Sequence, residues 1–253
     1  MTTQRIIVGV DGSVGARTAL EWAVDECRLR ACTLLVVHAR ERDPNAGGPV
    51  LLGYDAAAES LLTEHAAAAS ARRSSVPVTT LLSGGLPAET LIELSVDAEL
   101  VVVGTRGSNG FTSTMLGSVS NRTAGHAHCP VAVVPQRLPA LRVPDGERDV
   151  VVGVSGGRSG RLALEFARHE AQLRGARLQS VEAGTEPVEA LLRAAEGAQL
   201  LVLGCHHSDD QWGSRLGPVP TSILHRSPCP VVAVSEVPER PNEPLQWSEA
   251  GRR

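Results

Sequence analysis

The chain of 253 residues contains an internal repeat, and no other feature constrains its fold as strongly. Residues 5–39 align without a gap with residues 149–183, at an offset of 144. Further along, residues 86–105 align with residues 186–205 at an offset of 100, which also holds for the last apolar run of each copy. The offset falls from 144 to 100, so the second copy is shorter by 44 residues. The sequence therefore predicts two related domains, one complete and one shortened.

Each copy alternates short apolar runs with amphipathic segments, a pattern that predicts a parallel sheet between layers of helices. A helix is expected over residues 16–30, where apolar residues recur at helical spacing. Runs such as LVVVG are typical of strands that are buried on both faces. The strands predicted for the first copy are Ile6–Val10, Leu34–His38, Val78–Leu82, Leu100–Gly104 and Val131–Pro135. We therefore expect an α/β fold with two tandem doubly wound, Rossmann-like parallel-sheet domains.

The repeat also sets the expected domain boundaries. We assign residues 1–136 to the complete domain, 137–148 to a linker with two prolines, 149–235 to the shortened domain and 236–253 to a polar, flexible tail. The second copy is expected to lack one strand and one helix. Because RLQSVEAG aligns with either the second or the third strand of the first copy, the sequence leaves open which unit is missing.

Composition excludes several classes of function. All 24 basic residues are arginines, so chemistry that needs a lysine amine is excluded. With 28 acidic residues the formal net charge is −4, and the chain has no basic excess for nucleic-acid binding. No stretch approaches the ~18 apolar residues of a membrane span, and the five cysteines form no C-x-x-C pair. The sequence predicts a cytoplasmic protein with reduced thiols that binds neither nucleic acid nor membranes.

Doubly wound sheets bind ligands outside the carboxyl ends of their strands, so residues that follow the strands are the first candidates for a site. In the first copy these residues are Asp11, Ala39, Gly85 and Gly104. The segment that begins at Gly104 reads GTRGSNGFTSTMLGS and contains Gly107, Gly117 and Ser118. Glycines allow backbone amides to approach a polyphosphate closely, and a serine hydroxyl adds a further hydrogen bond. These residues indicate a phosphate-binding loop.

The spacing G-x2-G-x9-G-S at Gly104, Gly107, Gly117 and Ser118 resembles the ATP-binding branch of the universal stress protein family. The segments VGVDGS, LVVHA and HCPVAVV extend this resemblance, which covers both copies. It implies ATP, with Mg²⁺, as the ligand of the first domain, and an ATP-binding regulatory role in a stress response. It further implies that Asp11 faces the ribose or the metal, that the backbone at Ala39 contacts adenine, that the four motif residues line the phosphates, and that Val119 contributes its amide.

The resemblance also implies that such domains pair through their last strands, here PVAVV and PVVAV. The two copies are then expected to form an internal pseudo-dimer, and two chains a homodimer. The second copy departs from the nucleotide-binding pattern, because Ser155, His207 and Pro218 stand at the positions of the carboxylate, the second glycine and the serine. Proline removes an amide and a hydroxyl together, and histidine adds a Cβ where the loop must approach phosphate. We expect no ATP binding by the second copy.

Several alternatives compete with this interpretation. The segment SGGRS at Ser155–Ser159 is similar to the loop of ATP pyrophosphatases, but Ser159 stands where those enzymes have aspartate. Cysteine and histidine cluster at 205–207 and at 126–129, at a spacing poorly suited to zinc, and no metal site is expected. Because no nucleophile elbow or paired carboxylate motif is present, slow ATP hydrolysis is the most catalysis that we expect. A scaffold that dimerises without binding nucleotide is the remaining alternative.

Overall fold

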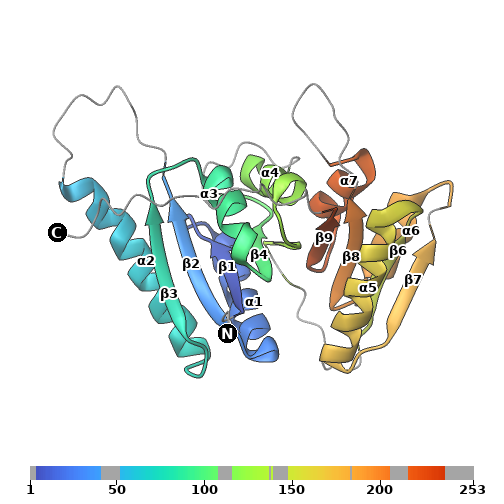
Figure 1. Ribbon diagram of the computed structural model, residues 1–253, viewed down its shortest axis with the longest axis horizontal. Coiled ribbons are helices and arrows are strands. Elements are labelled where there is room, and N and C mark those ends of the chain that lie inside the picture. Colours follow the sequence, from blue (N-terminus) through green and yellow to red (C-terminus); the bar gives the residue numbers. More distant parts are fainter. Residues whose placement is uncertain are drawn as a thin grey trace.

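The computed structural model describes residues 4–40, 52–107, 116–136, 138, 148–182, 184–205 and 216–236, and every structural statement below concerns this part of the chain. Its nine strands form one continuous sheet in the order β3-β2-β1-β4-β5-β9-β8-β6-β7 (Figure 1). Each of the nine strands pairs in parallel with at least one neighbour in its own half of the sheet. The halves join where β5 and β9 pair antiparallel.

The first half contains five parallel strands: β1 (Arg5–Gly9), β2 (Thr33–Ala39), β3 (Val78–Ser83), β4 (Leu100–Gly104) and β5 (Val131–Val134). Its helices are α1 (Val14–Arg30), α2 (Leu52–Arg72), α3 (Pro87–Leu94), the short 3-10 helix η1 (Ser95–Asp97) and α4 (Ser118–His126). The second half contains β6 (Val150–Val154), α5 (Gly157–Arg174), β7 (Leu178–Glu182), α6 (Pro187–Ala195), β8 (Leu200–Cys205), α7 (Pro218–Arg226) and β9 (Val231–Ser235).

The predicted parallel α/β sheet is confirmed, with small differences at the ends of elements. β1 spans Arg5–Gly9 instead of Ile6–Val10. β5 stops before Pro135, because proline has no N–H to donate to a neighbouring strand. α1 begins two residues earlier than expected because Ser13 caps it, and the Ser13 hydroxyl accepts the N–H of Ala16 at 3.1 Å.

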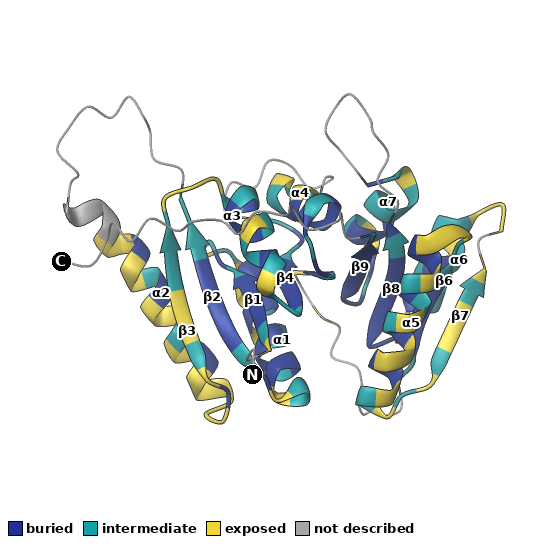
Figure 2. Cartoon of the chain, viewed as in Figure 1, coloured by how far each residue is buried: buried dark blue, intermediate teal, exposed yellow. Residues whose placement is uncertain are grey.

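The strand register identifies the unit that the second half lacks. Val150 pairs with Leu178 in the same way that Ile6 pairs with Leu34, so β7 corresponds to β2. β7 leads on to α6, and the described residues of the second half include no counterpart of α2 and β3. β7 is therefore an edge strand, and its polar residues Ser180 and Glu182 are exposed (Figure 2).

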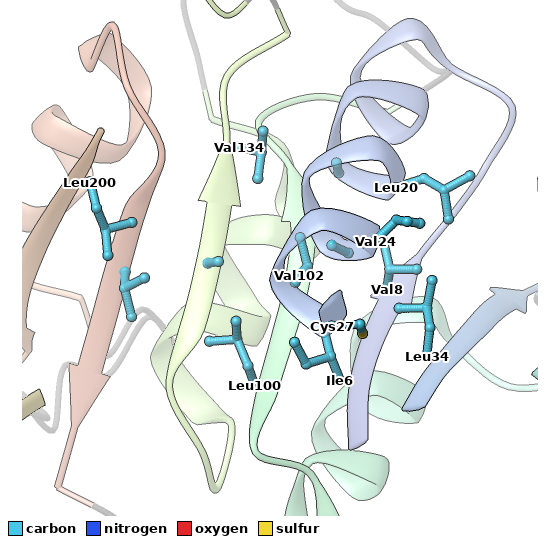
Figure 3. Packing of buried hydrophobic residues seen from close by; sticks show 14 of the residues in the cluster. Ile6, Val8, Leu20, Val24, Cys27, Leu34, Leu100, Val102, Val134 and Leu200 are labelled. Carbon is cyan, nitrogen blue, oxygen red and sulfur yellow. The ribbon is translucent and has the colours of Figure 1, made fainter. Parts of the chain in front are cut away.

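Two apolar layers hold the helices against the sheet. On one face α1, α2 and α5 pack on alternate residues of the strands, for example on Ile6, Val8 and Val102 (Figure 3). On the other face α3, α4, α6 and α7 pack on the intervening residues. The central strands are thus buried on both faces, as their unbroken aliphatic runs predict, and their carboxyl ends are left as the part of the sheet that can form a site.

The junction between the halves combines a strand pair with a buried group of charges. Ala132 of β5 lies opposite Val232 of β9, two residues that the offset of 100 makes equivalent. Nearby, α1 and α5 exchange ion pairs. The guanidinium of Arg30 contacts Glu170 at 2.5 Å, and that of Arg174 contacts Glu26 at 2.6 Å. The offset of 144 relates these two pairs to each other, so equivalent residues make reciprocal contacts.

Candidate functional site

A cleft of about 970 Å³ opens at the carboxyl ends of β1, β2 and β4. Its walls come from these strand ends, from α2 and α3, and from the beginning of α4. The structure brings together all the residues for which the sequence predicts a binding role: Asp11, Ala39, Gly104, Gly107, Gly117, Ser118 and Val119. Gly85 is a candidate from the sequence because it follows a strand, but it is not among the residues that line the cleft.

One side of the cleft is apolar. Val37 and Ala39 line it from β2, and Leu91 lines it from α3. The opposite wall comes from α2, where Ala58 is buried and Leu61 is half-buried. Sequence reasoning did not assign this wall to the site. Apolar side chains from a strand end and from a helix suit an aromatic ring system as ligand.

The other side of the cleft is polar and begins at Asp11. Its Oδ1 accepts the N–H of Ser13 at 3.0 Å, which fixes the carboxylate beside the first turn of α1. A Cβ on Gly107 would lie only 2.5 Å from Oδ2 of the same carboxylate. Asp11 and Gly107 are far apart in the sequence but adjacent in the cleft. The absence of a side chain at residue 107 leaves room for the carboxylate.

The N-terminus of α4 faces the same cleft. Gly117 is its N-cap, with extended backbone angles, and no side chain among the described residues caps the helix. The Gly117 N–H donates to the Thr105 carbonyl at 2.9 Å, and the Ser120 hydroxyl donates to the Gly104 carbonyl at 2.5 Å. These bonds hold the helix against the loop that follows β4. The amides of Ser118 and Val119 lie in the first turn, where N–H groups have no intrahelical acceptor and attract anions.

Charged side chains that sequence reasoning missed also line the cleft. They are Arg40 and Arg106. Arg40 directly follows β2, and Arg106 lies two residues beyond β4. The rule that ligands bind outside the carboxyl ends of the strands could therefore have identified both residues from the sequence. His38, at the end of β2, lines the cleft too, and its Nδ1 is 2.8 Å from the Val10 carbonyl. The cleft lining thus includes cationic groups as well as a helix N-terminus.

Gly104 has a packing role that its place in the motif does not reveal. A Cβ at this residue would lie 2.8 Å from the carbonyl carbon and oxygen of Gly15 in α1. In the second half a Cβ on Gly204 would lie 2.7 Å from the Ser159 carbonyl oxygen. Because this glycine is present in both halves, close packing of strand and helix explains it without a ligand.

We predict that Gly104→Ala lowers the free energy of unfolding by about 1–3 kcal/mol, the usual cost of overpacking. The backbone of α1 must move, because no flexible side chain is available to give way. Urea unfolding measures the effect. Gly217→Ala is the matched control, because its new Cβ would meet its nearest neighbour, the Cδ of Pro220, at 3.8 Å. Equal losses in the two variants would contradict this account.

The corresponding region of the second half differs at the helix N-terminus. α7 begins at Pro218, and Pro220 follows two residues later, so two amides of its first turn are missing. Ser155 replaces the carboxylate, while His207 lies outside the described residues. The wall that α2 provides in the first half has no counterpart in the described part of the second half.

Within the described residues, no group of three or more His, Cys, Asp or Glu side chains is placed to hold a metal ion. The His126–Cys129 cluster falls in this part of the chain, whereas His206 and His207 fall outside it. None of the described helices combines the length and the hydropathy needed to cross a membrane.

Comparisons with known proteins agree with this architecture. Residues 2–135, just over half of the chain, match the Universal stress protein family. A universal stress protein of Mycobacterium tuberculosis is 27% identical over 314 residues, covering 96% of this chain and 98% of that protein. A second one from the same species is 36% identical over 176 residues, covering 68% of this chain and 62% of that protein.

A solved structure with the same fold is that of a universal stress protein from Archaeoglobus fulgidus. It aligns with a TM-score of 0.73 at 19% identity, covering 93% of this chain and 99% of that chain. The likeness shows that both halves of the sheet are shared with another protein of this kind. From the match of residues 2–135, together with this shared fold, it follows that the chain belongs to the universal stress protein family.

Proposed function

We propose that the chain is an ATP-binding regulatory protein and that it binds one ATP, with Mg²⁺, in the cleft of its first half. The observation that carries this proposal is the convergence of Asp11, Gly107 and the α4 N-terminus on one cleft of about 970 Å³. A cleft of this volume is large enough for a nucleotide. Family membership supports a role in the stress response.

The division of the cleft into two sides supports a nucleotide over a purely apolar or purely ionic ligand. In the proposal, adenine occupies the apolar side of the cleft between Ala39 and the α2 wall, and the phosphates reach the amides of Ser118 and Val119. Mg²⁺ prefers carboxylate, water and phosphate oxygens, and Asp11 is the carboxylate of the described cleft lining. We assign it to the metal or to the ribose.

We further propose that the halves act as two domains, 1–136 and 149–235, paired as an internal pseudo-dimer. The antiparallel β5–β9 pair and the reciprocal ion pairs of α1 and α5 support this arrangement. The prolines at the start of α7 support a second domain that does not bind ATP. Its role in the proposal is to dock on the first domain.

Calorimetric titration of the full chain with Mg-ATP tests the function, and we expect a stoichiometry of one site per chain. Gly117→Val is expected to abolish binding, because a Cβ at residue 117 already lies 3.2 Å from the Thr105 carbonyl oxygen. Gly217→Val, the equivalent change in the second half, is the control and should leave binding intact.

Each other outcome rejects part of the proposal. Two sites per chain would mean that the second half also binds ATP. No binding by the unmodified chain would favour a scaffold that only pairs its domains. Release of phosphate during the titration, measured in parallel, would indicate an ATPase and not a purely regulatory binding protein.

A further inference from the structure

The C-terminus of α1 brings two cysteines together. The helix ends at Arg30 and is followed by Ala31, whose φ of 53° lies in the left-handed region. The Cys32 N–H then donates to the Cys27 carbonyl at 3.1 Å. This is the Schellman arrangement, in which the side chains at the two ends of that bond pack against each other. Here both side chains carry a thiol.

The geometry of this cap is compatible with a disulfide. With ordinary bond lengths, a hydrogen bond between the Cys27 carbonyl and the Cys32 amide limits the Cα–Cα separation to about 7 Å or less. Disulfides require a separation of about 4.4–6.8 Å. Both residues are buried, with exposures of 1% and 4%, and the Cys27 thiol donates to the Thr33 carbonyl at 3.5 Å.

The second half shows that the cap does not need these thiols. The Ala176 N–H donates to the Ala171 carbonyl at 2.9 Å, after Gly175 in the left-handed conformation. The offset of 144 makes Ala171 and Ala176 equivalent to Cys27 and Cys32. The same backbone motif therefore forms when both side chains are alanine. The thiols of Cys27 and Cys32 are not needed to form the cap.

The electrostatics differ between the thiols of this pair. The hydrogen bond with Cys27 lowers the pKa of Cys32 against the opposing effects of burial and of the Glu99 charge, and the charge of Arg30 contributes to the lowering. The same hydrogen bond, together with burial, raises the pKa of Cys27. Cys32 is thus the better nucleophile of the two.

The other three thiols differ from Cys32 in the direction of their pKa shift. Burial raises the pKa of Cys129 and of Cys205 to about 12 each, and that of Cys229 to about 11. A buried thiol with a raised pKa reacts slowly with oxidants. The cap of α1 is therefore the part of the described chain where oxidation chemistry is best supported.

We propose that Cys27 and Cys32 are a modification site at which a peroxide converts the two thiols into a disulfide across the end of α1. The Cys32 thiolate attacks the peroxide, an S–O bond forms, the O–O bond breaks, and hydroxide leaves. The Cys27 sulfur then attacks the Cys32 sulfur, an S–S bond forms, and the S–O bond breaks. The oxygen leaves as water with the Cys27 proton. The two thiols lose two electrons in total, and hydrogen peroxide is reduced to two waters.

The full chain, reduced and then treated with hydrogen peroxide under native conditions, tests this proposal. Trypsin cuts after Arg28 and Arg30, so Cys27 falls in peptide 18–28 and Cys32 in peptide 31–40. Mass spectrometry without reduction should find these two peptides linked, at their summed mass less two hydrogens. The number of free thiols, counted in denaturant, should fall from five to three per chain.

The controls use the residues of the second half. Cys27→Ala and Cys32→Ala reproduce the Ala171 and Ala176 cap, so both variants should fold, which circular dichroism checks. Each should lose the linked peptides completely. The proposal is overturned if the folded, oxidised chain lacks the linked pair. It is also overturned if disulfides that involve the other three cysteines form at least as readily.

Discussion

Arg30→Met is expected to lower the free energy of unfolding by about 3–5 kcal/mol, the usual effect of removing one partner from a buried ion pair. For a chain of this length the loss corresponds to a fall in Tm of about 6–20 °C. The Arg30 side chain is 4% exposed and contacts Glu26, Glu99 and Glu170. Although burial alone would lower the pKa of Arg30, these carboxylates raise it, so the group stays charged. Without it, the buried carboxylates of Glu26 and Glu170 keep only one of their two arginines, Arg174.

A surface ion pair supplies the matched control for this variant. Arg177, 84% exposed, contacts Asp149 at 3.0 Å. Arg177→Met should cost less than about 1 kcal/mol, because exposed pairs are screened by water and pay side-chain entropy. Thermal unfolding followed by circular dichroism measures both variants. Similar Tm values for the two would show that the buried cluster contributes no more than a surface contact.

A second variant separates unpaired charge from lost packing. Glu170→Gln, added to Arg30→Met, removes a carboxylate that has lost one of its two arginines but keeps its volume. If unpaired charge causes the loss, the double variant should recover part of the stability. If lost packing causes it, the second substitution should give no recovery.

The strands were predictable because each carries its own signal. Runs such as LVVVG are apolar at every residue, and the structure buries them on both faces in the expected parallel order. The sequence did not decide whether residues 178–182 correspond to the second or the third strand of the first copy, because their apolar residues fit either. Pairing with β6 decided it, and pairing is not a local property.

The site was predictable where chain position alone determines geometry. Asp11 and Ala39 end parallel strands, and these strands share one edge of the sheet, so the residues that follow them converge. The α2 wall was missed because Ala58 and Leu61 belong to an alanine-rich segment whose apolar residues are not confined to one face of the helix. Nothing in that pattern distinguishes residues that cover the sheet from residues that line a cleft.

The buried charge cluster was not predictable from the repeat. The alignment placed Glu26 over Glu170 and Arg30 over Arg174, but it gave no reason for α1 to meet α5. In sequence, each Glu–Arg pair at a spacing of four is typical of a solvent-exposed helix face. The contact arises because β5 and β9 pair antiparallel and bring the two helices together on one face of the sheet.

Ser118→Pro is expected to weaken Mg-ATP binding by roughly 10- to 100-fold, if the proposed site is correct. The change removes the first amide and the hydroxyl of α4, and hydrogen bonds to a charged group contribute about 1.5–3 kcal/mol. It copies the second half, where Pro218 begins α7. Isothermal titration calorimetry of both proteins measures the ratio of Kd values.

The fold should tolerate this substitution, which makes the result interpretable. Proline is well accommodated at the first position of a helix. The preceding Gly117 has φ −61° and ψ 145°, a conformation that suits a residue before proline. Ser118 itself is exposed, so no core packing is lost. We expect the Tm without nucleotide to remain unchanged, and a large fall in Tm would make the affinity loss a consequence of unfolding.

Two further variants assign the effect to the backbone amide. Ser118→Ala keeps the amide and removes only the hydroxyl, so its loss should be smaller, about 2- to 10-fold. Pro218→Ser restores an amide in the second half but leaves Pro220, Ser155 and the missing α2 wall unchanged, so it should not create a second site. If Ser118→Pro and Ser118→Ala weaken binding equally, the hydroxyl and not the helix N-terminus holds the phosphate. If neither changes the Kd, the nucleotide does not lie against α4, and the proposed placement of its phosphates is wrong.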